Sequence, residues 1–93
     1  MQINFYMERA IDRFLLLIET EGVKFPWLER NTGIGSTRWN SVKRRTVEMR
    51  ASEIEALAKL WPEYAYWLTT GKEIPEVGQI SPITKKAQRG ITT

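Results

Sequence analysis

The segment at residues 25–44 reads FPWLERNTGIGSTRWNSVKR, and it predicts two short helices joined by a tight turn. Pro26 suits the first turn of a helix, where the missing N–H of proline costs nothing. Gly33 ends this helix, because glycine tolerates the positive φ that a tight turn requires. A second helix is expected from about Ser36 to Arg45. Two helices in this succession, the second polar and basic, are typical of a helix-turn-helix.

The second of these helices has a narrow apolar edge and a wide polar face. Trp39 and Val42 lie three residues apart on one side, and we expect them to point into the core together with Ile34. The other side chains then face outward, where they fit the major groove of duplex DNA. Asn40 is suited to a bidentate contact with adenine, and Arg44 to one with guanine. The predicted base-reading residues are Ser36, Thr37, Asn40, Ser41 and Arg44.

Positive charge is concentrated in the same part of the chain. The formal net charge is +3 over 93 residues, whereas residues 23–50 carry seven Lys or Arg against Glu29 and Glu48. Such a concentration is expected of a surface that binds a polyanion, because Lys and Arg neutralise phosphates. An alternative for the basic run at residues 43–45 is a solvated helix end, where cations suit the helix dipole. The predicted phosphate contacts are Lys24, Arg38, Lys43, Arg45 and Arg50.

Further helices are expected on both sides of this segment. An amphipathic helix is predicted from Asn4, its cap, to about Glu21. Ser52 and Glu55 form a predicted capping box that starts another helix, which Pro62 ends. A short helix at residues 63–70 follows, and no stretch shows the period-two alternation of a strand, so the sequence predicts an all-α fold. The apolar face of the first helix is expected to contain Met7, Ile11, Phe14, Leu15 and Ile18.

The apolar pattern fades from Lys72 onward. Pro75 and Pro82 interrupt the chain there, and the segment holds few large apolar residues and several charges. A composition of this kind does not support a packed core. We therefore predict a compact DNA-binding domain at residues 1–74 and a flexible C-terminal tail at residues 75–93.

Composition argues against an enzyme. The chain has no cysteine and no histidine, which removes disulfides, thiolate metal sites and the commonest general base. We expect no catalytic residue, no metal, no cofactor and no small-molecule substrate. The longest apolar run, Phe14 to Ile18, is far too short to span a bilayer, and the N-terminus lacks the pattern of a signal peptide. A cytoplasmic location is therefore expected.

The sequence resembles the lambda-repressor-like, or Xre/Cro, DNA-binding domains of phages and bacteria over roughly residues 5–74. Downstream, SEIEALA at 52–58 resembles the fourth helix of the family, and EYAYWLTTG at 63–71 resembles its closing helix. Two positions depart from the family pattern, namely Glu29, where a small residue is usual, and Phe25, where glutamine is frequent. The resemblance implies a five-helix all-α domain that binds a two-fold operator as a dimer. The matching residues within the turn motif are Leu28, Gly33, Ile34, Trp39 and Val42.

Two functions from different classes follow from these patterns. The first is a small transcriptional regulator of phage or mobile-element type, a repressor that binds specific double-stranded DNA as a homodimer. The second is a protein-interaction module, such as an antitoxin or adaptor, that uses the aromatic C-terminal end. Core packing explains most aromatic residues at that end, but Tyr66 lies off the apolar face formed by Tyr64, Trp67 and Leu68. Tyr66 is therefore the predicted partner contact.

Overall fold

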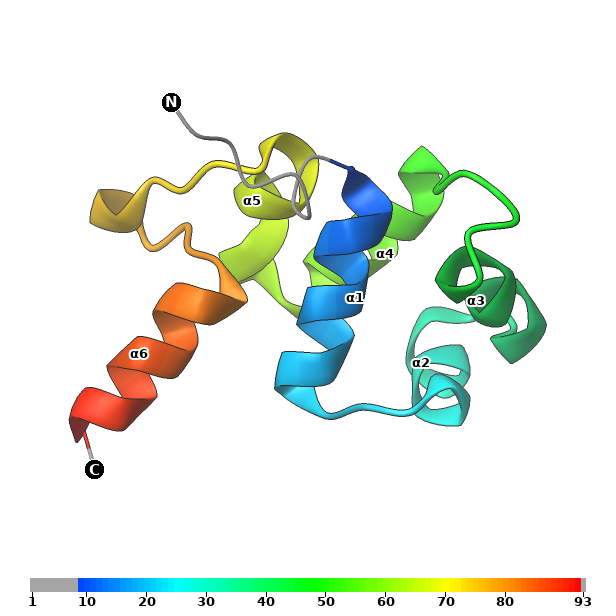
Figure 1. The fold of residues 1–93 in the computed structure, drawn as a ribbon, viewed down its shortest axis with the longest axis horizontal. Coiled ribbons are helices and arrows are strands. Elements are labelled where there is room, and N and C mark those ends of the chain that lie inside the picture. Colours follow the sequence, from blue (N-terminus) through cyan, green and yellow to red (C-terminus); the bar gives the residue numbers. More distant parts are fainter. Residues whose placement is uncertain (1–8, 93) are drawn as a thin grey trace.

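The structure is a computed structural model that describes residues 9–92, and the regular elements in this part of the chain are helices, without a strand (Figure 1). The expectation of an all-α fold is confirmed. Two short 3-10 helices, η2 and η3, accompany the α-helices at Pro62–Tyr64 and Pro75–Val77. The six α-helices are α1 Ala10–Glu21, α2 Phe25–Thr32, α3 Ser36–Lys43, α4 Ala51–Leu60, α5 Ala65–Thr70 and α6 Pro82–Thr92.

A core rich in aromatic residues holds the first five helices together. Phe14 of α1 stacks on Trp39 of α3 with their ring centroids 5.2 Å apart, so the outer helix α3 is fixed directly to the first helix. On the other side of α1, Tyr64 and Trp67 meet edge to face at 6.2 Å. Other fully buried members are Leu17, Leu28, Val42 and Leu57. In Figure 1, α2 and α3 form one end of the molecule, and α5 and α6 lie toward the other.

The helix ends agree with the sequence signals in some places and correct them in others. Gly22 and Gly33 end α1 and α2 in the left-handed conformation, at φ 69° and 78°, as predicted. The predicted cap Asn4 and the apolar Met7 lie outside the described residues. The predicted capping box of Ser52 with Glu55 is wrong, because the cap of α4 is Arg50, two residues before Ser52, and the helix begins at Ala51.

The carboxylate that caps α4 belongs to Glu53. It accepts a hydrogen bond from the backbone N–H of Arg50 at 2.7 Å, and Glu53 is buried, whereas Ser52 and Glu55 are exposed. Glu53 also receives the guanidinium of Arg38, so a single buried carboxylate serves both the helix end and α3. Because Arg38 binds Glu53, the helix begins where the carboxylate of Glu53, and not that of Glu55, accepts the hydrogen bond at the cap.

The C-terminal segment differs from the flexible tail that the sequence predicts. It contains η3 and the sixth helix, α6, so the five-helix expectation is one helix short. The N–H of Ile80 donates to the carbonyl of Glu63 at 2.9 Å, and Lys85 Nζ lies 2.5 Å from Glu63 and 3.3 Å from Glu21. Ser81 and Pro82 are buried at the start of α6. Burial of Ile80 and Pro82, together with these polar contacts and ion pairs, thus orders the segment that was expected to be a flexible tail.

Candidate nucleic-acid interface

Helices α2 and α3 are joined by the three-residue turn Gly33–Gly35, and α3 divides its side chains as the sequence predicts. Trp39 and Val42 are 0% exposed and anchor α3 to the core, while Ile34 packs against that core from the turn. Among the predicted base-reading residues, Thr37 and Arg44 are exposed, and Ser36, Asn40 and Ser41 are partly exposed. All five therefore reach solvent from one short helix and its end.

Two of these side chains bond back to their own helix. Asn40 Nδ2 donates to the carbonyl of Ser36 at 3.1 Å, and Ser41 Oγ donates to the carbonyl of Thr37 at 3.2 Å. Both bonds connect a residue with the fourth residue before it, which is a common arrangement for short polar side chains in a helix. The bond of Ser41 is exposed and that of Asn40 is partly buried, so a ligand that offers better partners can reach both side chains.

Arg38 differs from the expectation of a phosphate contact. Its guanidinium is bound to both carboxylate oxygens of Glu53, and Nη2 also donates to the carbonyl of Glu48 at 2.7 Å. The side chains of Arg38 and Glu53 are 19% and 2% exposed, so the pair lies between α3 and α4 rather than on the outer face. Burial alone would raise the pKa of Glu53, but the hydrogen bonds from Arg38 and Arg50 hold it below its usual range. Arg38 thus fixes the angle of α3 against α4.

The other predicted phosphate contacts, Lys24, Lys43, Arg45 and Arg50, are exposed. Arg45 has a φ of 63°, the left-handed conformation that usually belongs to glycine at this position after a helix. Its N–H donates to the carbonyl of Val42, and the next N–H, that of Thr46, donates to the carbonyl of Ser41. Arg45 Nη2 also lies 2.6 Å from Asp12 of α1. A side chain is thus kept where glycine would be less strained.

Glu29 is a residue of this interface that the sequence reasoning did not assign. Its Oε1 accepts a hydrogen bond from the backbone N–H of Ser36, the first residue of α3, at 2.9 Å. This bond lowers the pKa of Glu29, so the carboxylate is ionised at neutral pH. The sequence did offer a signal for this role, because Glu29 stands at a position where the resembling family usually has a small residue. The structure explains that departure, since a small residue cannot cap the helix from seven positions away.

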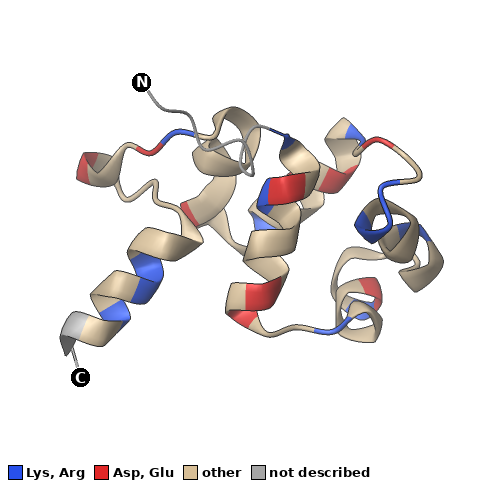
Figure 2. Cartoon of the chain, viewed as in Figure 1, with Lys and Arg blue, Asp and Glu red and all other residues tan. Residues whose placement is uncertain are grey.

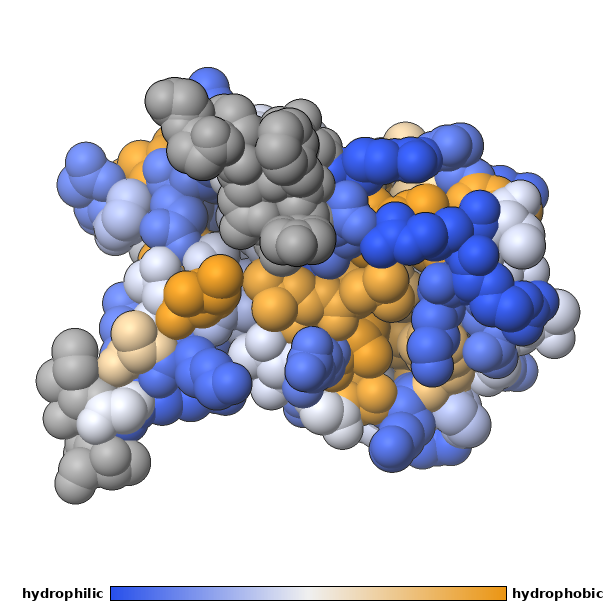
Figure 3. Space-filling view, viewed as in Figure 1, coloured by the Kyte–Doolittle hydropathy of each residue, from blue (hydrophilic) through white to orange (hydrophobic). Residues whose placement is uncertain are grey.

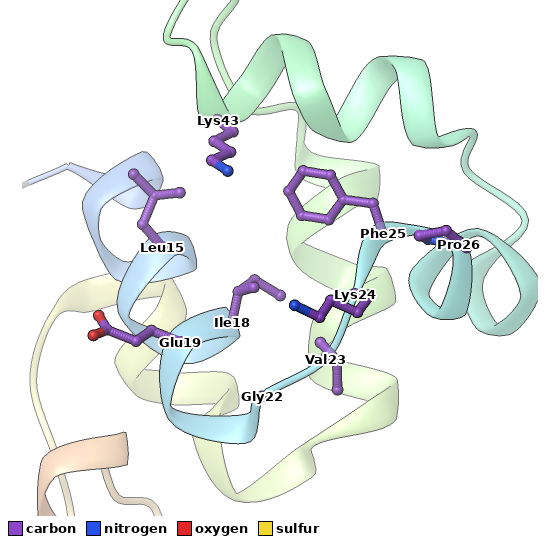
Figure 4. A pocket seen from close by; sticks show the side chains of 9 residues that line it. All are labelled: Leu15, Ile18, Glu19, Gly22, Val23, Lys24, Phe25, Pro26 and Lys43. Carbon is purple, nitrogen blue, oxygen red and sulfur yellow. The ribbon is translucent and has the colours of Figure 1, made fainter.

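The charges of the described residues are unevenly distributed. Figure 2 shows Lys and Arg on α3 and the segment after it, and acidic residues along α1. Figure 3 shows an apolar area over α1, bordered by hydrophilic residues on the side of α2 and α3. Between these regions lies a hollow of about 560 Å³, which receives Lys24 and Lys43 from two different elements (Figure 4). We call it the α1–α3 hollow.

Neither a metal-binding group of side chains nor a membrane-spanning helix is found among the described residues. It contains no group of His, Cys, Asp or Glu side chains placed to hold a metal ion. None of the helices described is both long and apolar enough to cross a membrane. Tyr66, the predicted partner contact, is 37% exposed and lies on α5, away from α3 (Figure 1).

These features define an all-α domain in which two short helices and a tight turn present a polar, cationic face. The solved structure of Pf6r, from the filamentous phage Pf6 of Pseudomonas aeruginosa PA01, matches this fold with a TM-score of 0.77 and 35% sequence identity. The match covers 92% of this chain and 100% of Pf6r, and the chain belongs to the same family as Pf6r. No protein-family model and no curated protein matches the chain.

Proposed function

We propose that this protein is a helix-turn-helix transcriptional repressor that binds specific sites in duplex DNA as a homodimer. The observation that carries the proposal is the division of α3, whose Trp39 and Val42 are wholly buried while its hydroxyl, amide and cationic side chains reach solvent. An α-helix with its side chains is about 10–12 Å across, which fits the width of the major groove, about 12 Å. The family relation to a phage protein supports a phage or mobile-element setting.

Each polar residue of α3 has a proposed part in recognition. Asn40 and Arg44 read base edges, because an amide matches adenine and a guanidinium matches guanine. Thr37 and Ser41 add shorter contacts on the same face, and Ser36 supports them from the first turn. Reaching a base requires Asn40 and Ser41 to give up the bonds that they make to their own helix, 3.1 and 3.2 Å long. The bond of Ser41 is exposed and that of Asn40 is partly buried, and neutral bonds of this kind contribute only about 0.5–1.5 kcal/mol each, so the exchange costs little.

Exposed cations around α3 supply the affinity that does not depend on sequence. We assign phosphate contacts to Lys24, Lys43, Arg45 and Arg50, and we leave Arg38 out because Glu53 holds its guanidinium. Arg45 also pairs with a carboxylate, that of Asp12, but its side chain is 47% exposed against 19% for Arg38, so it can exchange this partner for a phosphate. Contacts of this kind release counterions, so the dissociation constant should rise steeply with salt.

A selection from random duplexes, followed by fluorescence anisotropy over a series of salt concentrations, tests the proposal. We expect an enriched sequence with two related half-sites about 34 Å apart, which is one turn of DNA. Asn40→Ala should reduce the preference among operators, while Lys43→Ala should weaken all duplexes alike and lower the salt slope by about one unit. Lys72→Ala, an exposed lysine after α5, is the matched control. Failure to enrich any sequence at low salt would refute the proposal.

Exposed apolar side chains at the other end of the molecule favour a second candidate, a protein-interaction module such as an antitoxin or adaptor. Tyr66, Val77 and Ile83 are 37%, 69% and 57% exposed near α5, η3 and the start of α6. Exposed large apolar residues are frequent at binding surfaces, where they contact a partner. Stable co-purification of another protein that Tyr66→Ser abolishes, without DNA binding at low salt, would select this candidate over the first.

A further inference from the structure

The α1–α3 hollow has the size and composition of a small-molecule site. It is bounded by α1, the connection from α1 to α2, the start of α2 and the last turn of α3 (Figure 4). Its volume of about 560 Å³ is within the usual range of ligand pockets, about 300–1,000 Å³. DNA phosphates that contact Lys24 and Lys43 at the rim of the hollow would leave its apolar interior empty. The apolar part of its wall is formed by Leu15, Ile18, Val23 and Phe25.

The hollow also has a cationic opening. The ammonium groups of Lys24 and Lys43 both turn toward it in Figure 4, one from the connection and one from α3. No ion pair within residues 9–92 engages either lysine. Lys43 Nζ lies 5.9 Å from the centre of the Phe25 ring, so this charge is held over the apolar wall. Glu19 belongs to the lining, but its carboxylate points away from the two ammonium groups (Figure 4).

This combination selects one ligand chemistry. A neutral apolar molecule would cover Leu15 and Ile18 but leave both ammonium groups without a partner. Inorganic phosphate would pair with the lysines and leave the apolar wall exposed to water. A molecule with an apolar body and one carboxylate satisfies both parts, since burial of apolar area and pairing of charge each add to the affinity.

We propose that the α1–α3 hollow binds a small amphipathic carboxylate. The apolar body lies against Leu15, Ile18 and Phe25, and the carboxylate lies between Lys24 and Lys43. Both lysines are also assigned to DNA phosphates above, so the ligand and the DNA backbone compete for the same charges. The ligand is therefore a negative effector, and this regulatory half of the proposal rests on the proposed function, whereas the binding half does not.

Titration with octanoate, followed by NMR of backbone amides, tests the binding half. We expect the signals that shift to belong to residues 15–26 and to Lys43. We expect 1-octanol, which has the same chain without the charge, to bind about tenfold more weakly, and Lys24→Gln with Lys43→Gln to remove this difference. Lys72→Gln is the matched control and should leave the octanoate affinity unchanged. Equal affinity for octanol and octanoate, shifts elsewhere in the molecule, or full affinity in the double variant would each overturn the proposal.

Anisotropy with a labelled operator duplex tests the regulatory half. Octanoate should raise the dissociation constant for DNA severalfold, and acetate at the same ionic strength should not. If octanoate binds in the hollow while DNA affinity stays the same, competition is refuted and the ligand site remains. If the protein binds no duplex at any salt concentration, the proposed function fails, and the octanoate titration still decides whether the hollow is a ligand site.

Discussion

The turn between α2 and α3 allows a sharp comparison of two glycines that lie two residues apart. Gly33 has φ 78° and ψ 0°, whereas Gly35 has φ −67° and ψ 151°, an ordinary extended conformation. A Cβ built on either residue meets no heavy atom within 4 Å. The same substitution, Gly33→Ala or Gly35→Ala, therefore differs only in what it does to the backbone.

The expected difference in unfolding free energy follows from these angles. At Gly33 the left-handed conformation costs alanine about 1–2 kcal/mol. Alanine also gives the unfolded chain fewer conformations than glycine does, so folding loses less entropy, and this offsets part of the cost. We expect a net loss of about 1 kcal/mol at Gly33. At Gly35 the entropic gain of about 0.4–1 kcal/mol opposes the weaker capping of α3 by alanine, so stability should change little. Gly33→Asn should recover part of the loss, because asparagine tolerates this conformation.

Urea unfolding followed by tryptophan fluorescence measures both changes. The chain has four tryptophans, and Trp39, which packs beside the turn, is 0% exposed. A loss of about 1 kcal/mol should lower the urea midpoint by roughly 0.5 M, and the melting temperature by about 4–8 °C. Equal midpoints for the two alanine variants, or a larger loss at Gly35, would refute the claim that the left-handed backbone at Gly33 determines the turn.

Three further predictions concern charged residues. Glu53→Gln should destabilise the protein by about 3 kcal/mol in the same assay. This value is near the lower limit of the free energy lost when a buried ion pair is broken, because Arg38 keeps some access to water. A loss below about 1 kcal/mol would show that the pair does not fix α3. The pKa of Glu53 lies below its ordinary value of 4.5. The contribution of Glu53 to stability is therefore complete above the pKa that this carboxyl has in the unfolded chain, and it is lost as the pH falls toward the pKa in the folded protein. Acid titration of the wild type should show this loss of stability, and Glu53→Gln should reduce it. Glu29→Gln keeps an acceptor for the Ser36 N–H and removes a negative charge beside α3, so it should raise the affinity for every duplex severalfold, whereas Glu55→Gln on the exposed side of α4 should have no effect in the same anisotropy assay.

The sequence predicted the central part of the fold because its signals there are local. Gly33 specifies the turn by itself, and Trp39 and Val42 specify which face of α3 is buried by their spacing alone. The exposed positions of Thr37 and Arg44 then follow from the same helical period. The partner contact of Tyr66 and the pairing of α3 with DNA remain predictions, since both depend on molecules outside this chain.

Long-range pairs between charged residues could not be predicted in the same way. Arg38 binds Glu53, which is 15 positions away in the sequence, and Lys85 binds Glu21, which is 64 positions away. A charged side chain carries no periodic signal that names its partner, so Arg38 was expected on phosphate and the segment after residue 75 was expected to be a tail. Both corrections have the same cause, which is that folding brings together charges whose distance in the sequence says nothing about their distance in space.

The direction of α6 has a practical consequence. Figure 1 shows α6 leaving the body of the molecule at the end opposite α3, and its last residues carry the chain further away. A fluorophore, an affinity tag or a fused reporter domain joined to the end of α6 would therefore start far from the surface that we assign to DNA. Helix α1, by contrast, lies directly against α3, because its Phe14 stacks on Trp39.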